Sequence, residues 1–358
     1  MITNFENILN DTITKVMREE IDNEVVNKAE RGIFPDHLWD KLDEVGVMTV
    51  CIPENNGGAG FSIKDAFNII RIAGKYTAPI PLAETLVGNW MLHQSGIKIG
   101  SGPLSIASPK HSHNIKFTEG QKDSLINGNA KRVPFGRYVN RMIVFGRDRN
   151  NEAMISVIDS SQIELSNGRN LAGEARDDIH LKEVYVSKNN YKKISEENLK
   201  EFDRILTLTR VCLMAGALEK VMEMTIRYAK EREQFGRPIG KFQAIKQQLA
   251  VMASQVSSAI TATEYAIDSL NGKLNLESEV MVAKVRVGEA VGIVAPIAHQ
   301  VHAAIGFTYE HPLHHCTRRL WSWRDECGSE SEYALKLGRS ILENSANSLW
   351  SIITLSKC

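Results

Sequence analysis

The stretch YAKEREQFGRPIGKFQ, residues 228–243, joins two segments of helical periodicity through a corner that contains glycine and proline. Gly236, Pro238 and Gly240 end the first helix, and a second helix is expected from about Phe242. Basic side chains surround the rings of Phe235 and Phe242: Lys230, Arg232, Arg237, Lys241 and Lys246. A basic helix corner is usually a solvated surface. Here glycine permits close backbone approach and arginine offers paired donors to phosphate, which favours a ligand with a diphosphate and a flat ring.

The composition makes any such anion site a local feature. Lys+Arg and Asp+Glu both number 43, so the formal net charge is +0 and no overall field attracts nucleic acid or an anionic membrane. The five cysteines include no CxxC pair, which indicates a reducing cytoplasm. The polar N-terminus resembles neither a secretory signal nor a transit peptide, and no run of about 18 apolar residues predicts a membrane span.

The periodicity along the chain predicts a mostly α protein with a small central β domain. Residues 1–100 form an expected N-terminal helical domain, 101–190 a small antiparallel sheet or barrel, and 191–358 a C-terminal four-helix bundle. The expected helices cover 4–30, 35–45, 63–75, 82–94, 198–232, 241–271, 276–304 and 329–355. The expected strands include 140–146, 153–159 and 179–186, with a turn at Asn127-Gly128 among those that separate the strands.

Two other segments carry weaker signals. NGGAGF (56–61) lacks the full GxGxxG pattern and is interpreted as a tight loop between helices. EHPLHHC (310–316) contains residue types that bind zinc, but they are crowded into one segment that Pro312 interrupts, and no second ligand pair occurs elsewhere. No metal site is therefore predicted.

Three segments resemble motifs of the acyl-CoA dehydrogenase superfamily. YAKEREQFGRPIGKFQAIKQQLA is similar to its R-x-x-F-G…Q motif, and IPENNGGAGFS (52–62) to its PE-x-x-GG-x-G loop. HQVHAAIGFTYEHPLHHCTRR (299–319) resembles its Q-x-x-GG-x-G-x-x-x-E-x-P motif. The three occur in the family's order over nearly the whole chain, and the expected helix–sheet–helix layout is the family's fold. The chain is identified as a short member, similar to subunits of heteromeric bacterial acyl-CoA dehydrogenases.

This resemblance implies an FAD-dependent enzyme that desaturates an acyl-CoA thioester between its α and β carbons. A carboxylate removes the α-proton, and flavin receives the β-hydride. The resemblance also implies a homo- or hetero-oligomer, dimer or tetramer, with FAD at subunit interfaces, and an electron-transfer flavoprotein as a partner. The residues that match the family's cofactor-binding positions are Arg232, Gln234, Phe235, Gln243, Gln300, Ala304 and Ser329.

The chain departs from the family pattern in its central domain and after Gln300. LSIASPKHSHNIKFTEGQ (104–121) lacks the family's glycine-serine-aspartate element, and RVPFG (132–136) stands where the family has an aromatic-I-T/S-N-G strand. Ala303 and Ala304 replace a glycine pair, so two methyl groups are expected to crowd the approach of a diphosphate.

The catalytic base also departs from the pattern. The family's glutamate falls on Cys327, whose thiol has an ordinary pKa near 8.5 and suits the role poorly. Glu326 is one position early, which on a helix turns a side chain by about 100°. Asp325 is a weaker candidate. In members that carry the base on the first bundle helix, the matching position is Leu206, with Glu201 and Asp203 out of register.

Two functions follow from these departures. In the first, Glu326 is the base of an active dehydrogenase. In the second, the chain is a non-catalytic or partly catalytic subunit that supports assembly and a shared FAD site, and a partner supplies the base. A DNA-associated flavoprotein is disfavoured by the zero net charge.

Overall fold

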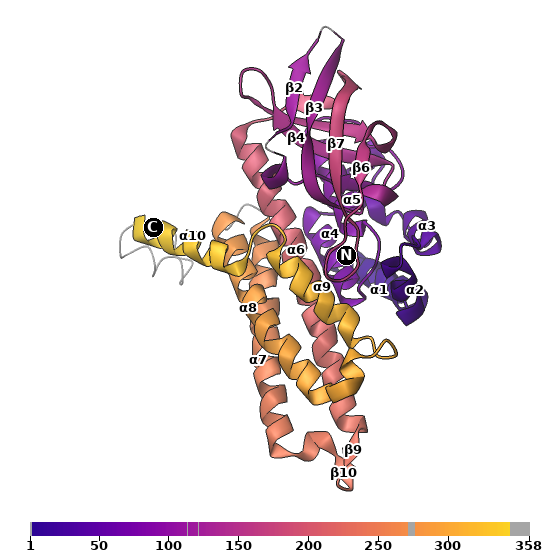
Figure 1. Ribbon diagram of the computed structural model, residues 1–358, viewed down its shortest axis with the longest axis vertical. Helices are drawn as coiled ribbons and strands as arrows, with labels where there is room; N and C mark the ends of the chain where they lie inside the picture. The colour runs from indigo at the N-terminus through magenta and orange to yellow at the C-terminus, as the bar shows by residue number, and fades with distance from the viewer. Residues whose placement is uncertain (1, 113, 121, 271–275, 344–358) are drawn as a thin grey trace.

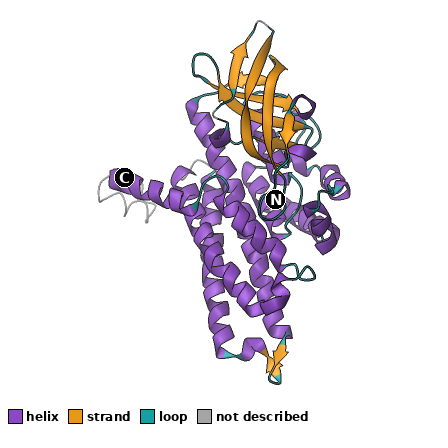
Figure 2. Ribbon diagram, in the orientation of Figure 1, coloured by secondary structure: helices purple, strands orange, loops and turns teal. Residues whose placement is uncertain are grey.

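In the computed structural model, the described residues (2–112, 114–120, 122–270 and 276–343) form three successive regions (Figure 1). Helices come first, a sheet follows, and long helices complete the chain. Figure 2 shows the large sheet at one end of the molecule. The predicted fold class, mostly α with a small central β region, is confirmed. The division into three domains at residues 100 and 190 stays a prediction. Among the described helices, none is both long and apolar enough to cross a membrane.

The N-terminal helices largely match the predicted ranges. They are α1 (Ile2–Glu20), α2 (Asn23–Glu30), α3 (Asp36–Glu44), α4 (Ile63–Lys75) and α5 (Leu82–Gln94), with the 3₁₀ turns η1 (Val47–Thr49) and η2 (Glu54–Asn56). The helix predicted over 4–30 is two helices, because the Asp22 carboxylate accepts a hydrogen bond from the Val25 N–H at 2.8 Å and starts a new one. Ser62 caps α4, in a capping box with Asp65.

The sheet follows the order β6-β7-β3-β2-β4-β5-β8, with β1 paired to β4. Its strands are β1 (Leu104–Ile106), β2 (Lys116–Glu119), β3 (Asp123–Pro134), β4 (Arg141–Arg147), β5 (Ala153–Asp159), β6 (Glu164–Ser166), β7 (Arg176–Ser187) and β8 (Tyr191–Lys193). The 3₁₀ turns η3 (Pro109–His111), η4 (Gly136–Tyr138) and η5 (Ser160–Gln162) connect them. Strands β1 and β2 run parallel to β4, and the other pairs are antiparallel.

The turn predicted at Asn127-Gly128 is wrong, because both residues lie inside β3. The register of β3 against β7 shifts there, and the Asn127 side chain accepts a hydrogen bond from the Glu183 N–H at 2.9 Å. Gly128 has φ +141°, and a Cβ at this position would lie 2.4 Å from the carbonyl oxygen of Asn114. Glycine therefore marks a bulge with a close backbone approach rather than a chain reversal.

The C-terminal region is built on α6 (Glu196–Glu231), which runs from the sheet to the far tip of the molecule (Figure 1). The tip is a short hairpin, and further helices return from it: β9 (Glu233–Gln234), β10 (Arg237–Pro238), η6 (Ile239–Lys241), α7 (Gln243–Ser269), α8 (Leu276–His302), η7 (Ala303–Phe307), α9 (Leu313–Asp325) and α10 (Glu330–Glu343). Helix α9, which was not predicted, packs against α6 and α8. The predicted helix 329–355 is confirmed as far as residue 343, and its remainder lies outside the described residues.

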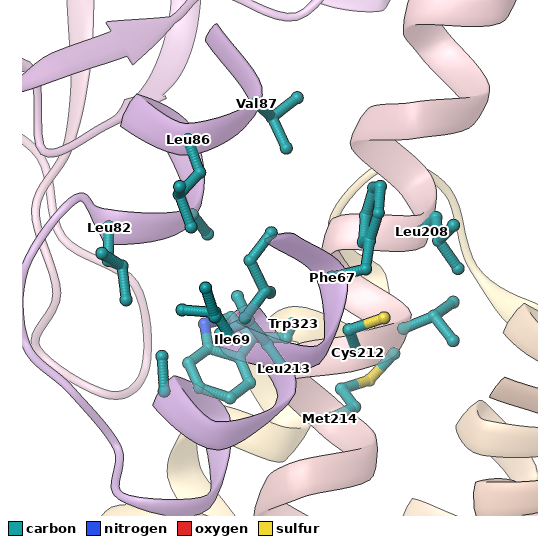
Figure 3. Close-up of a cluster of buried hydrophobic side chains, with 14 of the residues drawn as sticks. Phe67, Ile69, Leu82, Leu86, Val87, Leu208, Cys212, Leu213, Met214 and Trp323 are labelled. Carbon is teal, nitrogen blue, oxygen red and sulfur yellow. The ribbon is translucent and has the colours of Figure 1, made fainter. Parts of the chain in front are cut away.

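Helices α4 and α6 cross closely because each presents a glycine to the other. A Cβ on Gly74 would lie 2.2 Å from the carbonyl oxygen of Leu213, and a Cβ on Gly216 would lie 1.9 Å from that of Arg71. Around this crossing, Figure 3 shows a buried apolar cluster contributed by several helices, including Phe67 from α4 and Cys212 from α6. This packing fixes α6 relative to the N-terminal helices and so places both ends of the candidate site.

Candidate functional site

The basic corner forms the tip of the molecule, opposite the sheet (Figure 1). Phe235 is 92% exposed and adopts φ +53° at the hairpin turn. Its ring meets Phe242 edge to face at 6.1 Å between centroids, and the Arg237 guanidinium lies 4.3 Å from the Phe242 ring centre. Helix α7 starts here at Gln243, and its N-cap residue Phe242 provides no side-chain cap. The free N–H groups and cations of the corner therefore suit a diphosphate.

Gln300 and Ala304 lie at the same end of the bundle as the corner. Tyr228, one turn before Arg232 on α6, stacks on His302 of α8 at 4.6 Å between ring centroids. Gln300 and Ala304 are both exposed. Six of the seven predicted cofactor-binding residues thus gather at one end. Ser329 is the exception: it lies between α9 and α10, where its hydroxyl accepts a hydrogen bond from the Glu332 N–H at 3.3 Å.

Glu326 follows α9 and is held by two arginines. Arg176 donates to Oε1 through Nε at 2.8 Å and to Oε2 through NH2 at 3.2 Å. Arg210 Nε lies 2.7 Å from Oε2. Burial alone would raise the pKa of Glu326, but attraction to Arg176 and Arg210 lowers it to about 2. The carboxylate is therefore ionised at neutral pH, has both oxygens occupied and holds little affinity for another proton.

Glu326 belongs to a buried chain of charges that joins the helices to the sheet. Arg210 also pairs with Glu84 of α5 at 2.8 Å, and Arg176 with Glu174 at 3.0 Å. Glu174 meets Arg319 of α9 at 3.2 Å, and Arg319 meets Glu30 of α2 at 2.8 Å. Acids and arginines alternate along this network, so each buried charge is neutralised by a neighbour. We call these residues the buried ion network: Glu30, Glu84, Glu174, Arg176, Arg210, Arg319 and Glu326.

Cys327 occupies a left-handed turn with φ +59°. Lys110 and Tyr333 both donate hydrogen bonds to its carbonyl oxygen, each at 2.9 Å. Lys284, which is fully buried, donates to the carbonyl oxygens of Arg324 at 2.8 Å and of Glu326 at 3.0 Å. Burial raises the pKa of the Cys327 thiol, so at neutral pH the group stays protonated and is not available to accept a proton. Two lysines and a tyrosine thus hold the backbone carbonyl groups of this loop.

Two cavities flank this loop. The larger has a volume of about 580 Å³ and lies between β4, α6, α8 and α10, with Lys110, Asp203 and Tyr333 in its wall. The smaller has about 110 Å³ and is lined by Glu326, Cys327, Leu206 and the end of β3, where Arg132 and Pro134 face it. The hydrogen bonds of Lys110 and Tyr333 to Cys327 connect the walls of the two cavities.

The corner and the Glu326 loop are far apart within one chain. Arg210 contacts Glu326, and Arg232 ends the same helix 22 residues later, which corresponds to about 33 Å at about 1.5 Å per residue. The corner's donor set fits the diphosphate of FAD. The smaller cavity lies below the range of about 300–1,000 Å³ typical of small-molecule sites, so the residues around Glu326 do not by themselves enclose a flavin ring.

Comparison with known proteins agrees with this architecture. The family model described as "Acyl-CoA dehydrogenase, N-terminal domain" matches residues 3–98, and "Acyl-CoA dehydrogenase, C-terminal domain" matches residues 202–324. Together they cover more than half of the chain. The chain belongs to the acyl-CoA dehydrogenase family. The resemblance derived from the three sequence motifs is therefore confirmed, and family membership supports an oxidoreductase that acts on acyl-CoA.

Relatives within the family are distant but nearly full-length. Acyl-CoA dehydrogenase FadE27 of Mycobacterium tuberculosis is 25% identical over 353 residues, which cover 87% of this chain and 90% of that protein. A chain of the ChsE4–ChsE5 complex from Mycobacterium tuberculosis superposes with a TM-score of 0.87 at 20% identity, covering 95% of this chain and 98% of that one. Butyryl-CoA dehydrogenase from Megasphaera elsdenii superposes with a TM-score of 0.86 at 17% identity. This match covers 94% of this chain and 98% of that one. The structural matches show a shared fold.

The sequence motifs did not identify the residues that surround Glu326. Arg176, Arg210 and Lys284 come from a strand and two helices, and none belongs to a recognised motif. Their only signal in the sequence is a charge within an otherwise apolar helical stretch, as for Arg210 and Lys284. Across the described ranges, no three His, Cys, Asp or Glu side chains are arranged to hold a metal ion.

Proposed function

We propose that this chain is a subunit of an FAD-dependent dehydrogenase that introduces a double bond between the α and β carbons of an acyl-CoA thioester. The observation that carries the proposal is the exposed corner, where arginines and an uncapped helix N-terminus stand beside two aromatic rings. In such an enzyme, bound FAD accepts the β-hydride. The residues that would hold its diphosphate half are Arg232, Gln234, Phe235, Gln243, Gln300 and Ala304, with Ser329 near the ring end of a neighbouring site.

The distance between the corner and the Glu326 loop supports assembly of the chain into an oligomer. A corner about 33 Å from Glu326 serves a reacting centre only when a second subunit brings its own loop to it. Exposed apolar side chains at this end support burial in an oligomer: Phe235, Ile305, Phe307 and Tyr309. We propose a homo- or hetero-oligomer with FAD between subunits and an electron-transfer flavoprotein as the electron acceptor, in the reducing cytoplasm that the unpaired cysteines favour.

The larger cavity is the proposed site for the arm of the thioester. Phe145, Leu199 and Met281 provide an apolar surface, while Lys110, Lys200 and Lys336 provide positive charge. Its volume of about 580 Å³ lies in the range of small-molecule sites. An apolar wall with several cations suits the phosphopantetheine arm of CoA, which carries amides and a phosphate. The smaller cavity beside Cys327 would receive the reacting end.

A second candidate function is a subunit that supports assembly and a shared FAD site while a partner supplies the base. The observation that favours it is the pairing of Glu326 with two arginines, which lowers the pKa of Glu326 to about 2. The assignment of Glu326 as the catalytic base stays a prediction. The ChsE4–ChsE5 complex contains two differently named chains of this fold, which supports a heteromeric arrangement here.

Replacing Arg232 by alanine is expected to weaken FAD binding by about 10- to 100-fold. The reason is that a charge-assisted hydrogen bond is worth about 1.5–3 kcal/mol, and about 1.4 kcal/mol corresponds to a factor of ten. Flavin fluorescence titration of the apoprotein, alone or with its related subunit, measures the change. Arg149→Ala removes an exposed arginine of the sheet region and serves as the matched control. Equal FAD affinity in Arg232→Ala and wild type would remove the corner from the cofactor site.

A further inference from the structure

Strand β3 contains a bulge at Lys131 and Arg132, beside the smaller cavity. The register of β3 against β7 shifts between Ala130 and Val133, so that two residues of β3 oppose only Asp178. The Asp178 carboxylate accepts a hydrogen bond from the Arg132 N–H at 2.9 Å, and Arg132 adopts φ +56°. Bulges redirect side chains and are common next to active sites. The bulge is therefore a defined feature of the cavity wall.

The bulge brings two consecutive cations to one cavity. In a regular strand, neighbouring side chains point to opposite faces of the sheet. Here Lys131 and Arg132 both line the smaller cavity, together with Leu206 and Cys327. Within the described ranges, neither cation makes a hydrogen bond or an ion pair through its side chain. Two adjacent positive charges thus stand where the reacting end of the substrate is proposed to bind.

The other charges in the wall of the smaller cavity do not neutralise these two cations. Glu84 and Glu326 both pair with Arg210 inside the buried ion network. Asp325 is the remaining acid of the wall, and it is exposed. In the part of the chain that the structure describes, Asp325 forms no ion pair with either cation of the bulge. The bulge therefore offers its two cations to an anion from outside the chain.

The volume of the smaller cavity limits what can occupy it. About 110 Å³ corresponds to roughly four water molecules at about 30 Å³ each, so one small group reaches every part of the wall. A saturated acyl chain would displace water from the two cations without pairing them, which costs free energy. A carboxylate would pair with both, because arginine offers two parallel donors and lysine a compact charge.

We propose that the substrate is a short acyl-CoA whose acyl chain ends in a carboxylate, and that Lys131 and Arg132 bind this carboxylate. This inference rests on the proposed acyl-CoA dehydrogenase function and names its substrate class. The carboxylate lies at the far end of the acyl chain from the thioester and takes no part in the transfer of the proton or the hydride. Lys131 and Arg132 therefore determine specificity, because they favour a charged acyl end over a neutral one.

Flavin bleaching by two thioesters of similar length tests this specificity. The FAD-loaded protein, alone and with its related subunit, is mixed with glutaryl-CoA or hexanoyl-CoA at limiting concentration and without an electron acceptor. We expect the wild type to bleach faster with glutaryl-CoA. Arg132→Met and Lys131→Met should each lower this preference by about 10- to 100-fold, the usual contribution of a hydrogen bond between charged groups. Arg132→Lys, which keeps the charge, restores part of the preference.

A binding measurement and a control variant accompany the bleaching rates. Calorimetry on the dithionite-reduced protein measures the affinity for both thioesters without turnover, and the two Met variants should lose affinity for glutaryl-CoA in particular. Lys116→Met removes an exposed cation of β2 that lines neither of the two cavities. This control should keep the wild-type preference.

The ratio between the two thioesters separates substrate specificity from other roles of the bulge. An equal loss with both thioesters in Arg132→Met would mean that the bulge supports the fold or binds a part of CoA that both share. A loss of FAD affinity with an unchanged ratio would assign the cations to the cofactor. Either result would overturn the inference and leave the proposed function intact, as would a wild type that prefers hexanoyl-CoA or is FAD-loaded but bleached by neither thioester. Wild-type protein that binds no FAD would overturn the proposed function itself.

Discussion

Replacing Arg176 by methionine is expected to lower the free energy of unfolding by about 3–5 kcal/mol. Arg176 is 3% exposed and donates to both Glu174 and Glu326. Without it, Glu326 keeps Arg210 and a hydrogen bond from the Asn170 side chain. Glu174 keeps Arg319, the Asn170 amide and the Trp323 indole N–H. Two buried carboxylates would then lose a cationic partner, and the free energy of desolvating them would no longer be offset. Urea unfolding followed by circular dichroism measures the loss.

Lys182→Met provides the control for this prediction on the same strand, β7. Lys182 pairs with Glu164, but their side chains are 72% and 62% exposed. Exposed pairs contribute about 0–1 kcal/mol, because water screens both charges. The two variants therefore remove a similar contact at different depths. An equal, small effect of Arg176→Met and Lys182→Met would mean that the buried ion network does not stabilise the fold.

Gly216→Val is expected to prevent α4 and α6 from packing and to destabilise the protein by at least about 3 kcal/mol. A Cβ at residue 216 would lie 1.9 Å from the carbonyl oxygen of Arg71 and 2.7 Å from the amide nitrogen of Lys75. Both atoms belong to the backbone of α4, so no side-chain rotation relieves the overlap. The helices must move apart, which opens the apolar cluster around Phe67 (Figure 3). The yield of folded protein and its thermal midpoint measure the effect.

Gly338→Val tests whether this loss depends on the helix crossing. Gly338 also lies in a helix, α10, but no atom lies within 4 Å of the position that its Cβ would occupy. This variant should change stability by less than about 1 kcal/mol, the range of intrinsic helix preferences. A Gly216→Val protein as stable as Gly338→Val would show that α4 and α6 do not approach as closely as described.

The sequence predicted the fold well where local signals are strong. The periodicity of 63–75 defined α4, and the glycine and proline residues of 228–243 located the corner. The turn predicted at Asn127-Gly128 was wrong because a glycine in a bulge and a glycine in a turn have similar flanking residues. Only the close approach of the backbone at Asn114 distinguishes the two cases. Helix α9 was missed because Pro312 directly precedes it and His314 and His315 occupy its first turn, and its burial against α6 is a tertiary effect.

The candidate site was predictable in part for a related reason. Motifs identified the corner and the 325–329 loop because their residues are contiguous. The environment of Glu326 depends on Arg176 and Arg210, which are 150 and 116 positions away in the sequence. Proton affinity at a buried carboxylate is set by such distant neighbours, so it could be assessed only from the structure.

The central claim, that this chain forms an FAD-dependent acyl-CoA dehydrogenase with its neighbouring subunits, is tested most directly by the flavin spectrum. The protein is purified alone and co-expressed with its related subunit, and acyl-CoA is added without an electron acceptor. We predict a flavin absorbance that co-purifies with an oligomer and bleaches on addition of substrate, because the hydride passes to the flavin. Protein that carries no flavin in either preparation, and none after incubation with FAD, would contradict the claim.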